Sequence, residues 1–220
     1  MYKISVMCPT RKRAEKCVNS CNSLLENATN PEDIEVLLMF DEDDQESYDH
    51  VKKYYEGREN VKFFISERYG YTQLHKYYNF LAEEAQGPWL FLWNDDSVMN
   101  TVGWDDVVLE HECSFKVIGC SEDIDQGALF PIFPKKWVET TGRVSNNCSN
   151  DTWLELVARP LGIMVKEPRL SISHLRETSQ FDDDTRAERV YDSARFNSSE
   201  QAEERKIDRE KIQEAMSNAN

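Results

Sequence analysis

The sequence predicts an α/β fold in which a mostly parallel sheet is covered by helices. Three observations favour it. Short apolar runs occur at 3–8, 34–40, 61–65 and 89–93, an amphipathic stretch separates each run from the next, and Pro9, Pro31 and Gly87-Pro88 stand at the boundaries. Strands that alternate with helices need crossover connections, and these make the strands parallel and the crossovers right-handed.

The first elements follow from periodicity. The run at 34–40, IEVLLMF, is apolar at nearly every position, as a strand buried on both faces should be. Helices are expected at 12–28, 44–56 and 72–86. Apolar residues of the first of these helices share one side at helical spacing: Ala14, Val18, Cys21, Leu24, Leu25 and Ala28.

Beyond residue 103 the pattern loosens. It predicts a helix at 103–111, strands near 115–120 and 127–133, a helix at 149–159 and a last core strand at 161–165. The stretch 177–220 holds 12 acidic and 7 basic residues and no Trp, Pro or Gly. Such a segment cannot bury enough apolar surface to form its own core, so we expect a polar helical or flexible C-terminal tail, or an element docked on a partner.

Charge and composition exclude several classes of protein. The 220 residues carry a net charge of −15, which repels nucleic acid and anionic membranes. We see neither an export signal nor the ~20 apolar residues of a transmembrane span, and so expect a cytoplasmic protein with reduced thiols. Cys17 and Cys21 are placed to share a helix face, but two thiols do not make a zinc site, and ordinary core packing is the simpler interpretation.

The loop after the first strand concentrates positive charge. It reads Pro9-Thr10-Arg11-Lys12-Arg13 and contains neither a G-x-G-x-x-G nor a G-x-x-x-x-G-K-[ST] motif. A hydroxyl and three cations at a strand end suit a phosphorylated ligand. The alternative is a set of basic residues at the start of a surface helix.

Carboxylates follow the second and fourth strands. Asp43 and Asp44 are explained as helix-start residues, whereas Asp41 lies at the strand end, where it can bond a base or ribose. Asn94-Asp95-Asp96 ends a buried strand with two adjacent carboxylates, which is costly unless a cation neutralises them. Oxygen ligands beside a phosphate are typical of a Mg²⁺ or Mn²⁺ site.

The order of these motifs resembles a GT-A fold glycosyltransferase, and most closely the family 2 type. The matching residues are Pro9-Thr10-Arg11 with Arg13, then Asp41, Asn79, Asn94-Asp95-Asp96 as the D-x-D-type motif, Gly103-Trp104-Asp105 and the segment 130–162. The resemblance covers residues 1–176. It implies a nucleotide-binding half (1–102) and an acceptor half (103–176), with 177–220 outside it as an acidic tail.

The resemblance also implies roles. Pro9, Thr10, Arg11, Arg13, Asp41, Arg68, Asn94 and Asp95 would bind the nucleotide sugar, with the arginines facing the diphosphate. Asp96 would hold Mn²⁺ or Mg²⁺, unless a one-residue slip in the alignment makes the ligand Asp95, and His174 would complete the metal site or else be a surface histidine. The usual acidic pair near the acceptor is Asn150-Asp151 here, which leaves Asp151 as the candidate catalytic base. Its alternative is an N-cap for the following helix.

These roles describe an inverting, metal-dependent transfer of a sugar from a nucleotide-diphosphate sugar, UDP- or GDP-linked, to the hydroxyl of a glycan or another acceptor. Two other functions stay open. One is a nucleotidyltransferase that makes sugar nucleotides, which would want a glycine-rich first loop. The other is a non-catalytic nucleotide- or glycan-binding module derived from a transferase. The tail is a candidate surface for forming homo-oligomers.

Overall fold

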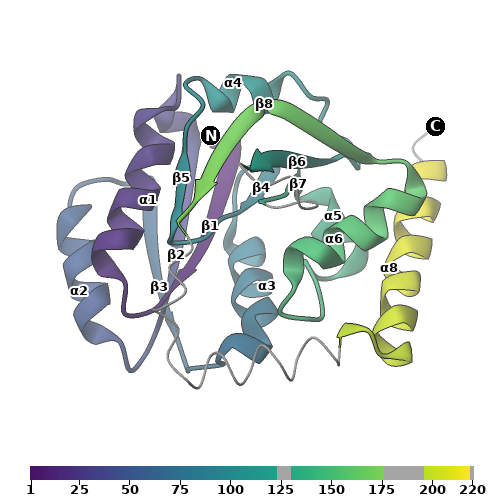
Figure 1. Ribbon diagram of the computed structural model, residues 1–220, viewed down its shortest axis with the longest axis horizontal. Coiled ribbons are helices and arrows are strands. Elements are labelled where there is room, and N and C mark those ends of the chain that lie inside the picture. The colour runs from purple at the N-terminus through teal and green to yellow at the C-terminus, as the bar shows by residue number, and fades with distance from the viewer. Residues whose placement is uncertain (123–129, 176–195, 219–220) are drawn as a thin grey trace.

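The computed structural model describes residues 1–122, 130–175 and 196–218. A sheet of eight strands, in the order β3-β2-β1-β4-β7-β6-β8-β5, runs through the centre. Helices α1 and α2 cover one face, α3, α5 and α6 lie on the other, and α8 packs outside α5 and α6 (Figure 1). The predicted α/β class with helices on both faces is therefore confirmed.

The N-terminal half is parallel, as predicted. Strand β1 pairs with β2 on one side and with β4 on the other, and β2 pairs with β3, all in parallel. The elements of this half, with the helices that connect them, are β1 (Ile4–Thr10), α1 (Ala14–Glu26), β2 (Ile34–Asp41), α2 (Gln45–Tyr54), β3 (Val61–Ser66), α3 (Leu74–Glu84) and β4 (Trp89–Leu92).

The second half is mixed. Strand β7 is antiparallel to β4 and to β6, β8 is parallel to β6, and the short β5 is antiparallel to β8. The elements here are β5 (Ser97–Met99), α4 (Trp104–Leu109), β6 (Val117–Glu122), β7 (Ile132–Pro134), α5 (Lys136–Thr141), α6 (Asn150–Ala158) and β8 (Met164–His174).

Several predicted boundaries need correction in this half. The last strand was expected at 161–165, but residues 159–161 form a 3₁₀ turn and β8 runs from Met164 to His174. Exposed and buried residues are interspersed along β8, so the strand has no continuous apolar run by which the sequence could predict it. Strand β5 and helix α5 were not predicted, since three and six residues carry little periodic signal. Of the expected strand at 127–133, residues 127–129 lie outside the described residues, and the strand observed here, β7, runs from Ile132 to Pro134.

The core divides between the two faces of the sheet. Along β1, Ile4, Val6 and Cys8 pack toward α1, whereas Met7 packs toward α3. This alternation is the period of two expected of a strand that is buried on both faces. All five tryptophans are fully buried, so Trp104, Trp137 and Trp153, for which stacking on an acceptor sugar was an alternative, belong to the core.

Helix α8 (Ser199–Ser217) docks on the domain. Its Ile212 and the preceding Phe196 join the core with α5 and α6, and its buried Asp208 accepts hydrogen bonds from Arg143 and from the indole of Trp153. The described part of the tail is thus a helix seated on its own chain. The predicted tail residues 177–195 lie outside the described residues.

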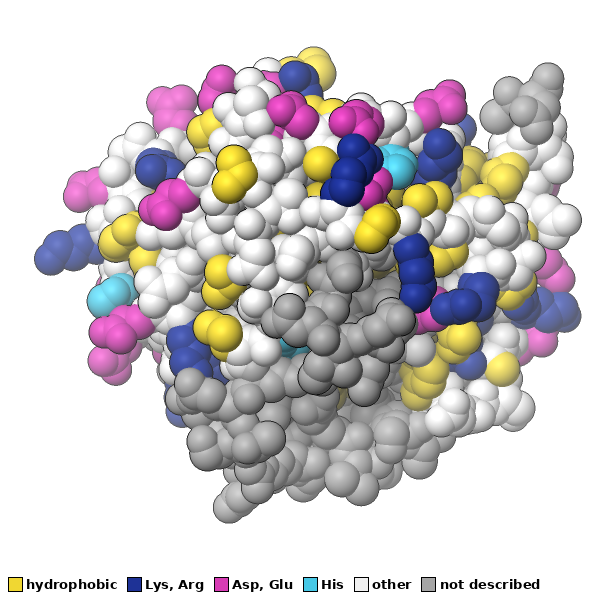
Figure 2. All heavy atoms as spheres, turned by 45° about the horizontal axis from the view of Figure 1, so that its top comes forward, with side chains coloured by type: hydrophobic (Ala, Val, Ile, Leu, Met, Phe, Trp, Pro, Cys, Tyr) yellow, Lys and Arg dark blue, Asp and Glu magenta, His cyan; other side chains and the backbone are white. Residues whose placement is uncertain are grey.

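Among the described residues on the face shown in Figure 2, acidic and basic side chains are interspersed. Among the described residues, none of the helices has the length and apolar character that crossing a membrane requires.

Candidate functional site

A cavity of about 1400 Å³ opens at the carboxyl ends of β1, β2 and β4. This is the edge of a doubly wound sheet at which ligands bind. All the residues that the sequence predicted for donor, metal and base line it: Pro9, Thr10, Arg11, Arg13, Asp41, Arg68, Asn94, Asp95, Asp96, Asp151 and His174. The sheet therefore brings together residues from 9 to 174.

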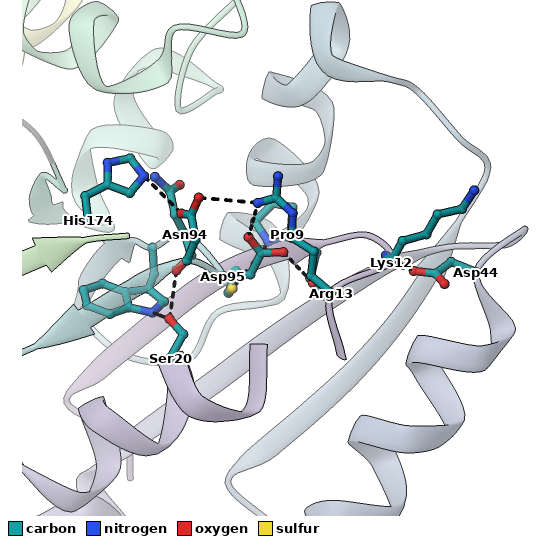
Figure 3. Close-up of polar contacts among 12 residues, drawn as sticks. Pro9, Lys12, Arg13, Ser20, Asp44, Asn94, Asp95 and His174 are labelled. Atoms are coloured by element: carbon teal, nitrogen blue, oxygen red, sulfur yellow. Dashed lines mark hydrogen bonds and ion pairs between the residues drawn. The ribbon is translucent and has the colours of Figure 1, made fainter. Parts of the chain in front are cut away.

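The loop between β1 and α1 contacts the carboxylates that follow β4. The hydroxyl of Thr10 donates to Asp95 Oδ2 at 2.8 Å, and Arg13 Nη1 lies 3.0 Å from Asp95 Oδ1 and 3.4 Å from Asp96 Oδ2. In Figure 3, Arg13 reaches the carboxylates from one side and His174 from the other. One guanidinium thus partly balances two acidic groups at the cavity floor.

Strand pairing in the sheet positions His174 beside the acidic motif. It ends β8, and the antiparallel pairing of β5 with β8 sets it opposite Ser97, directly after the acidic motif. Its Nε2 lies 3.0 Å from Asp96 Oδ1, and the backbone N–H of Leu175 donates to the carbonyl oxygen of Asp96 at 2.8 Å. Residues 78 positions apart in sequence become neighbours in this way.

The two carboxylates differ in their electrostatics. Burial raises the pKa of Asp95 to about 6, against the opposing effect of Arg13. Burial acts on Asp96 as well, but the hydrogen bond and charge of His174, together with Arg13, hold its pKa below the usual value. Asp96 is therefore the more readily ionised of the pair, and its ionised oxygen beside an imidazole nitrogen suits Mn²⁺.

Side chains that were not predicted hold the acidic motif in place. Ser20 of α1 accepts from the Trp93 indole at 2.7 Å and donates to the Asn94 carbonyl at 2.9 Å (Figure 3). From the other face, Tyr78 of α3 donates to the Trp93 carbonyl at 2.9 Å. The motif is clamped between two helices, which pre-organises its carboxylates. Both clamps depend on tertiary contacts that sequence spacing does not encode.

Asp41 lies in a second polar network at the cavity wall. Arg11 Nη1 is 3.0 Å from Asp41 Oδ2 and also contacts Asp43, and the Tyr77 hydroxyl donates to the other oxygen of Asp41. The pKa of Arg11 is raised by these carboxylates, chiefly by its hydrogen bond to Asp43. Arg68 is exposed at the rim of the same cavity.

Asp151 also lines the cavity, from the first turn of α6. The helix begins at Asn150 and its N-cap position is Ser149, so the alternative that Asp151 caps this helix is wrong. Burial raises the pKa of Asp151, and the N–H and hydroxyl of Thr152, which bond one of its oxygens, only partly offset this. A partly buried carboxylate with a raised pKa is suited to accept a proton.

The segment before Asp151 is fixed by Asn79 of α3. Its amide oxygen accepts from the N–H of Val144 at 2.8 Å, and its amide nitrogen donates to the Ser145 carbonyl at 3.0 Å. The hydroxyl of Ser145 in turn donates to the Asn150 side chain. Asn79 was matched to the family motif, and its structural role is to tie α3 to the turn that leads to Asp151.

The residues present fit a divalent cation. Asp96 and His174 would supply an oxygen and a nitrogen from adjacent strand ends, and Asp95 lies beside them. Mn²⁺ takes carboxylate and imidazole ligands, and Mg²⁺ takes carboxylates. A carboxylate beside an imidazole is thus a donor set that a divalent cation of this kind accepts.

Comparison with known proteins identifies the family. The model for "Glycosyl transferase family 2" matches residues 5–137, more than half of the chain. The protein belongs to glycosyl transferase family 2. A search of curated proteins found no match.

Solved structures share the fold at low identity. A mannosyltransferase from Pyrobaculum calidifontis in complex with GDP-Man and Mn²⁺ matches with a TM-score of 0.68 and 12% identity, over 100% of this chain and 76% of that one. Staphylococcus aureus TarS residues 1–349 with UDP-GlcNAc match with a TM-score of 0.65 and 14% identity, over 96% of this chain and 71% of that one. A further TarS 1–349 structure matches with a TM-score of 0.62 and 15% identity, over 78% of this chain and 60% of that one. The chain therefore spans less than two thirds of that structure's length.

Proposed function

We propose that this chain transfers a sugar from a nucleotide-diphosphate sugar to an acceptor hydroxyl, with inversion at the anomeric carbon and with Mn²⁺ or Mg²⁺. One observation carries the proposal. A single cavity is lined by the pair Asp95–Asp96, which Arg13 and His174 contact, and by the partly buried Asp151. The first group would bind the diphosphate, and Asp151 would face the acceptor.

The donor would lie along the carboxyl ends of β1, β2 and β4. Asp41 would accept a hydrogen bond from the base or ribose, and Asp95 from the ribose. Thr10 and Arg13 keep Asp95 in place, and Arg68 at the rim is an exposed cation for the diphosphate. The neighbours that carry UDP-GlcNAc and GDP-Man support a hexose linked to UDP or GDP.

The cation would be held by Asp96 and His174. When bound, it stabilises the negative charge that develops on the departing diphosphate. Arg13 already lies beside both carboxylates and adds positive charge at the same place. The Mn²⁺ in the Pyrobaculum complex supports a divalent ion in this fold.

Asp151 would take the proton of the acceptor hydroxyl as that oxygen attacks the anomeric carbon. Because the attacking oxygen and the leaving diphosphate lie on opposite sides of that carbon in a single displacement, the configuration inverts. Asp151 and Asp96 line the same cavity, as this displacement requires. A glycan or another hydroxyl compound is the acceptor.

Binding of the donor is the first test. UDP, GDP, dTDP and CMP are screened by thermal shift, each with and without Mn²⁺. A ligand at a hundredfold excess over its Kd stabilises the fold by about 2.7 kcal/mol. We expect one diphosphate to stabilise the protein only with Mn²⁺, and the effect to be lost in Asp96→Asn but kept in the control Asp49→Asn, an exposed carboxylate on α2.

A stabilised protein that neither hydrolyses nor transfers the sugar would favour the other candidate, a non-catalytic binding module. The asparagine at position 94, where the family pattern has an acid, favours that candidate. Metal-dependent release of the nucleotide from its sugar, abolished in Asp96→Asn, separates the two. A nucleotidyltransferase would instead join a sugar phosphate to a nucleoside triphosphate, and the first loop lacks the glycines for it.

A further inference from the structure

Three thiols meet in the core where α1 packs on β1. Cys8 near the end of β1 and Cys17 and Cys21 of α1 have no solvent exposure. Their ligand atoms all lie within 4.8 Å of one another. Sequence spacing indicated only the pair on the helix. The packing of β1 against α1 adds the third thiol, because Cys8 lies on the strand face that α1 covers.

The cluster is connected to the predicted donor site along the chain. Cys8 lies two residues before Thr10, whose hydroxyl donates to Asp95 at 2.8 Å. Cys8 precedes the loop that carries Thr10, Arg11 and Arg13, and Cys17 follows that loop, in the first turn of α1.

Sulfur geometry suits a soft cation. A tetrahedral Zn²⁺ with Zn–S bonds of ~2.3 Å holds its sulfurs about 3.8 Å apart, so sulfurs within 4.8 Å need to close by no more than about 1 Å. Three protein ligands leave a fourth position for water or a small thiol. Thiolates select Zn²⁺ and similar ions over the hard cations that carboxylates bind.

We propose that Cys8, Cys17 and Cys21 form a site for one thiophilic divalent cation such as Zn²⁺, distinct from the Asp96–His174 site. On binding, each thiol loses its proton to solvent, three metal–sulfur bonds form and no electron is transferred. Occupancy draws Cys8 and Cys17 toward the ion and shifts the loop between them, which loosens the hold of Thr10 on Asp95 and weakens nucleotide binding. This coupling rests on the proposed function, whereas the metal site itself does not.

Cadmium is the probe, because thiolate ligands give it a charge-transfer absorption in the near ultraviolet that carboxylate and imidazole ligands do not. Full-length reduced protein, freed of metal by chelation, is titrated with Cd²⁺ in the absence of nucleotide. We expect saturation at one ion per chain and the release of about three protons per ion. The proton count needs no variant and so stands even where a substitution harms folding.

Variants locate the site. Cys17→Ala and Cys21→Ala should each weaken Cd²⁺ binding by roughly tenfold or more. Cys113→Ala, which removes the exposed thiol, and Asp96→Asn, which removes the predicted ligand of the other site, should keep the absorption unchanged. Absorption that disappears only in Cys113→Ala, or no absorption from the folded wild-type protein, would overturn the proposal and leave three core thiols.

The coupling is measured separately. Binding of the diphosphate identified by thermal shift is compared with and without one equivalent of Zn²⁺, in the presence of Mn²⁺. We expect affinity to fall roughly fivefold or more with Zn²⁺ in the wild type and to stay constant in Cys17→Ala. Equal affinities in the wild type would refute the coupling. A protein that binds Cd²⁺ at the thiols but no nucleotide would refute the proposed function and leave the metal site standing.

Discussion

Asp151 shows how one residue acquires its chemistry from its surroundings. The carboxylate is placed in the first turn of α6 by the bonds of Asn79 to the preceding turn, and burial raises its pKa. A raised pKa makes a carboxylate a stronger base once it is ionised. At the cavity floor, Arg13 lies beside both Asp95 and Asp96, the His174 imidazole lies beside Asp96, and the pKa of Asp96 is held below its usual value. Asp151 and Asp96 thus have different electrostatic surroundings within one cavity.

Asp151→Asn is expected to abolish transfer while leaving the donor bound. The amide cannot accept the acceptor's proton, so kcat should fall by roughly 10²–10⁴-fold, with the nucleotide Kd nearly unchanged. Because the pKa of Asp151 is raised, the acidic limb of the wild-type pH profile should lie above the ordinary value of 3.8 and be absent from the residual rate of the variant. Steady-state kinetics from pH 4 to 9 measure both. A variant with full activity would remove Asp151 from the mechanism.

Tyr77→Phe tests the network around Asp41. The hydroxyl donates to Asp41 and accepts from the N–H of Tyr69, so its loss leaves a buried carboxylate with one partner fewer. We expect a loss of about 1–2 kcal/mol in the free energy of unfolding and a weaker donor Kd. Tyr48→Phe, on the outer helix α2, is the matched control and should leave the donor Kd unchanged. Urea unfolding and nucleotide titration give the two quantities.

At the scale of elements, the pairing of β5 with β8 is what completes the candidate metal site. The strand β8 also carries Glu167, which accepts from Arg169 and contacts His111 of the segment after α4. The hydrogen bond from Arg169 is the main reason that the pKa of Glu167 falls to about 2. These contacts fasten the start of β8 at the end of the sheet opposite His174.

Glu167→Gln should therefore change the acid sensitivity of the fold. A lowered pKa in the folded state stabilises the protein above about pH 4.5, and this contribution is lost as the pH falls toward 2. The wild type should lose more unfolding free energy between pH 6 and pH 3 than Glu167→Gln does. Urea unfolding at the two pH values measures the difference, and identical losses in both proteins would contradict the expectation.

Gly87, just before β4, packs closely against residues of β1. A Cβ at this position would lie 2.8 Å from the Ser5 hydroxyl and 2.9 Å from a backbone carbon of Ile4. The N–H of Gly87 donates to Ser5, which itself donates to the buried Glu35. Gly87→Ala is expected to cost about 1–3 kcal/mol of unfolding free energy, because backbone atoms have to move. Gly57→Ala has no neighbour within 4 Å and serves as the comparison for a substitution without overlap, although its φ of 83° adds strain of its own.

At the scale of the whole molecule, the C-terminal helix belongs to the fold. The ion pairs of Arg143 with Asp208 and Glu204, and the apolar contacts of Ile212, attach α8 to α5 and α6. Because α6 carries Asp151, the docking of α8 supports the element on which the candidate base lies. A helix as polar as this one has little amphipathic character of its own, so tertiary contacts of this kind supply most of its stability.

Asp208→Ala should loosen that docking. It leaves the partly buried Arg143 with Glu204 alone and the Trp153 indole without its acceptor, at a cost of about 2–3 kcal/mol in unfolding free energy. The rate of amide hydrogen exchange should increase more in α8 than in the other helices and strands. The exposed pair Lys206–Glu203 offers a control, since Glu203→Ala removes a solvent-screened surface interaction and should destabilise the fold much less. Equal destabilisation by the two substitutions would mean that Asp208 does not anchor the helix.

The sequence by itself determined the α/β class, the order of strands and helices through β4, and the set of residues that meet at the cavity. Apolar runs and helical spacing are local signals, and the carboxyl ends of parallel strands share one edge whatever the side chains. Only the tertiary structure decided the partners of those residues. The Asp96–His174 contact needs β5 and β8, both too short or too polar to be recognised alone, and the Ser20 and Tyr78 clamps need helices packed on both faces. The third thiol beside Cys17 and Cys21 likewise comes from a strand, because only packing brings distant segments into contact.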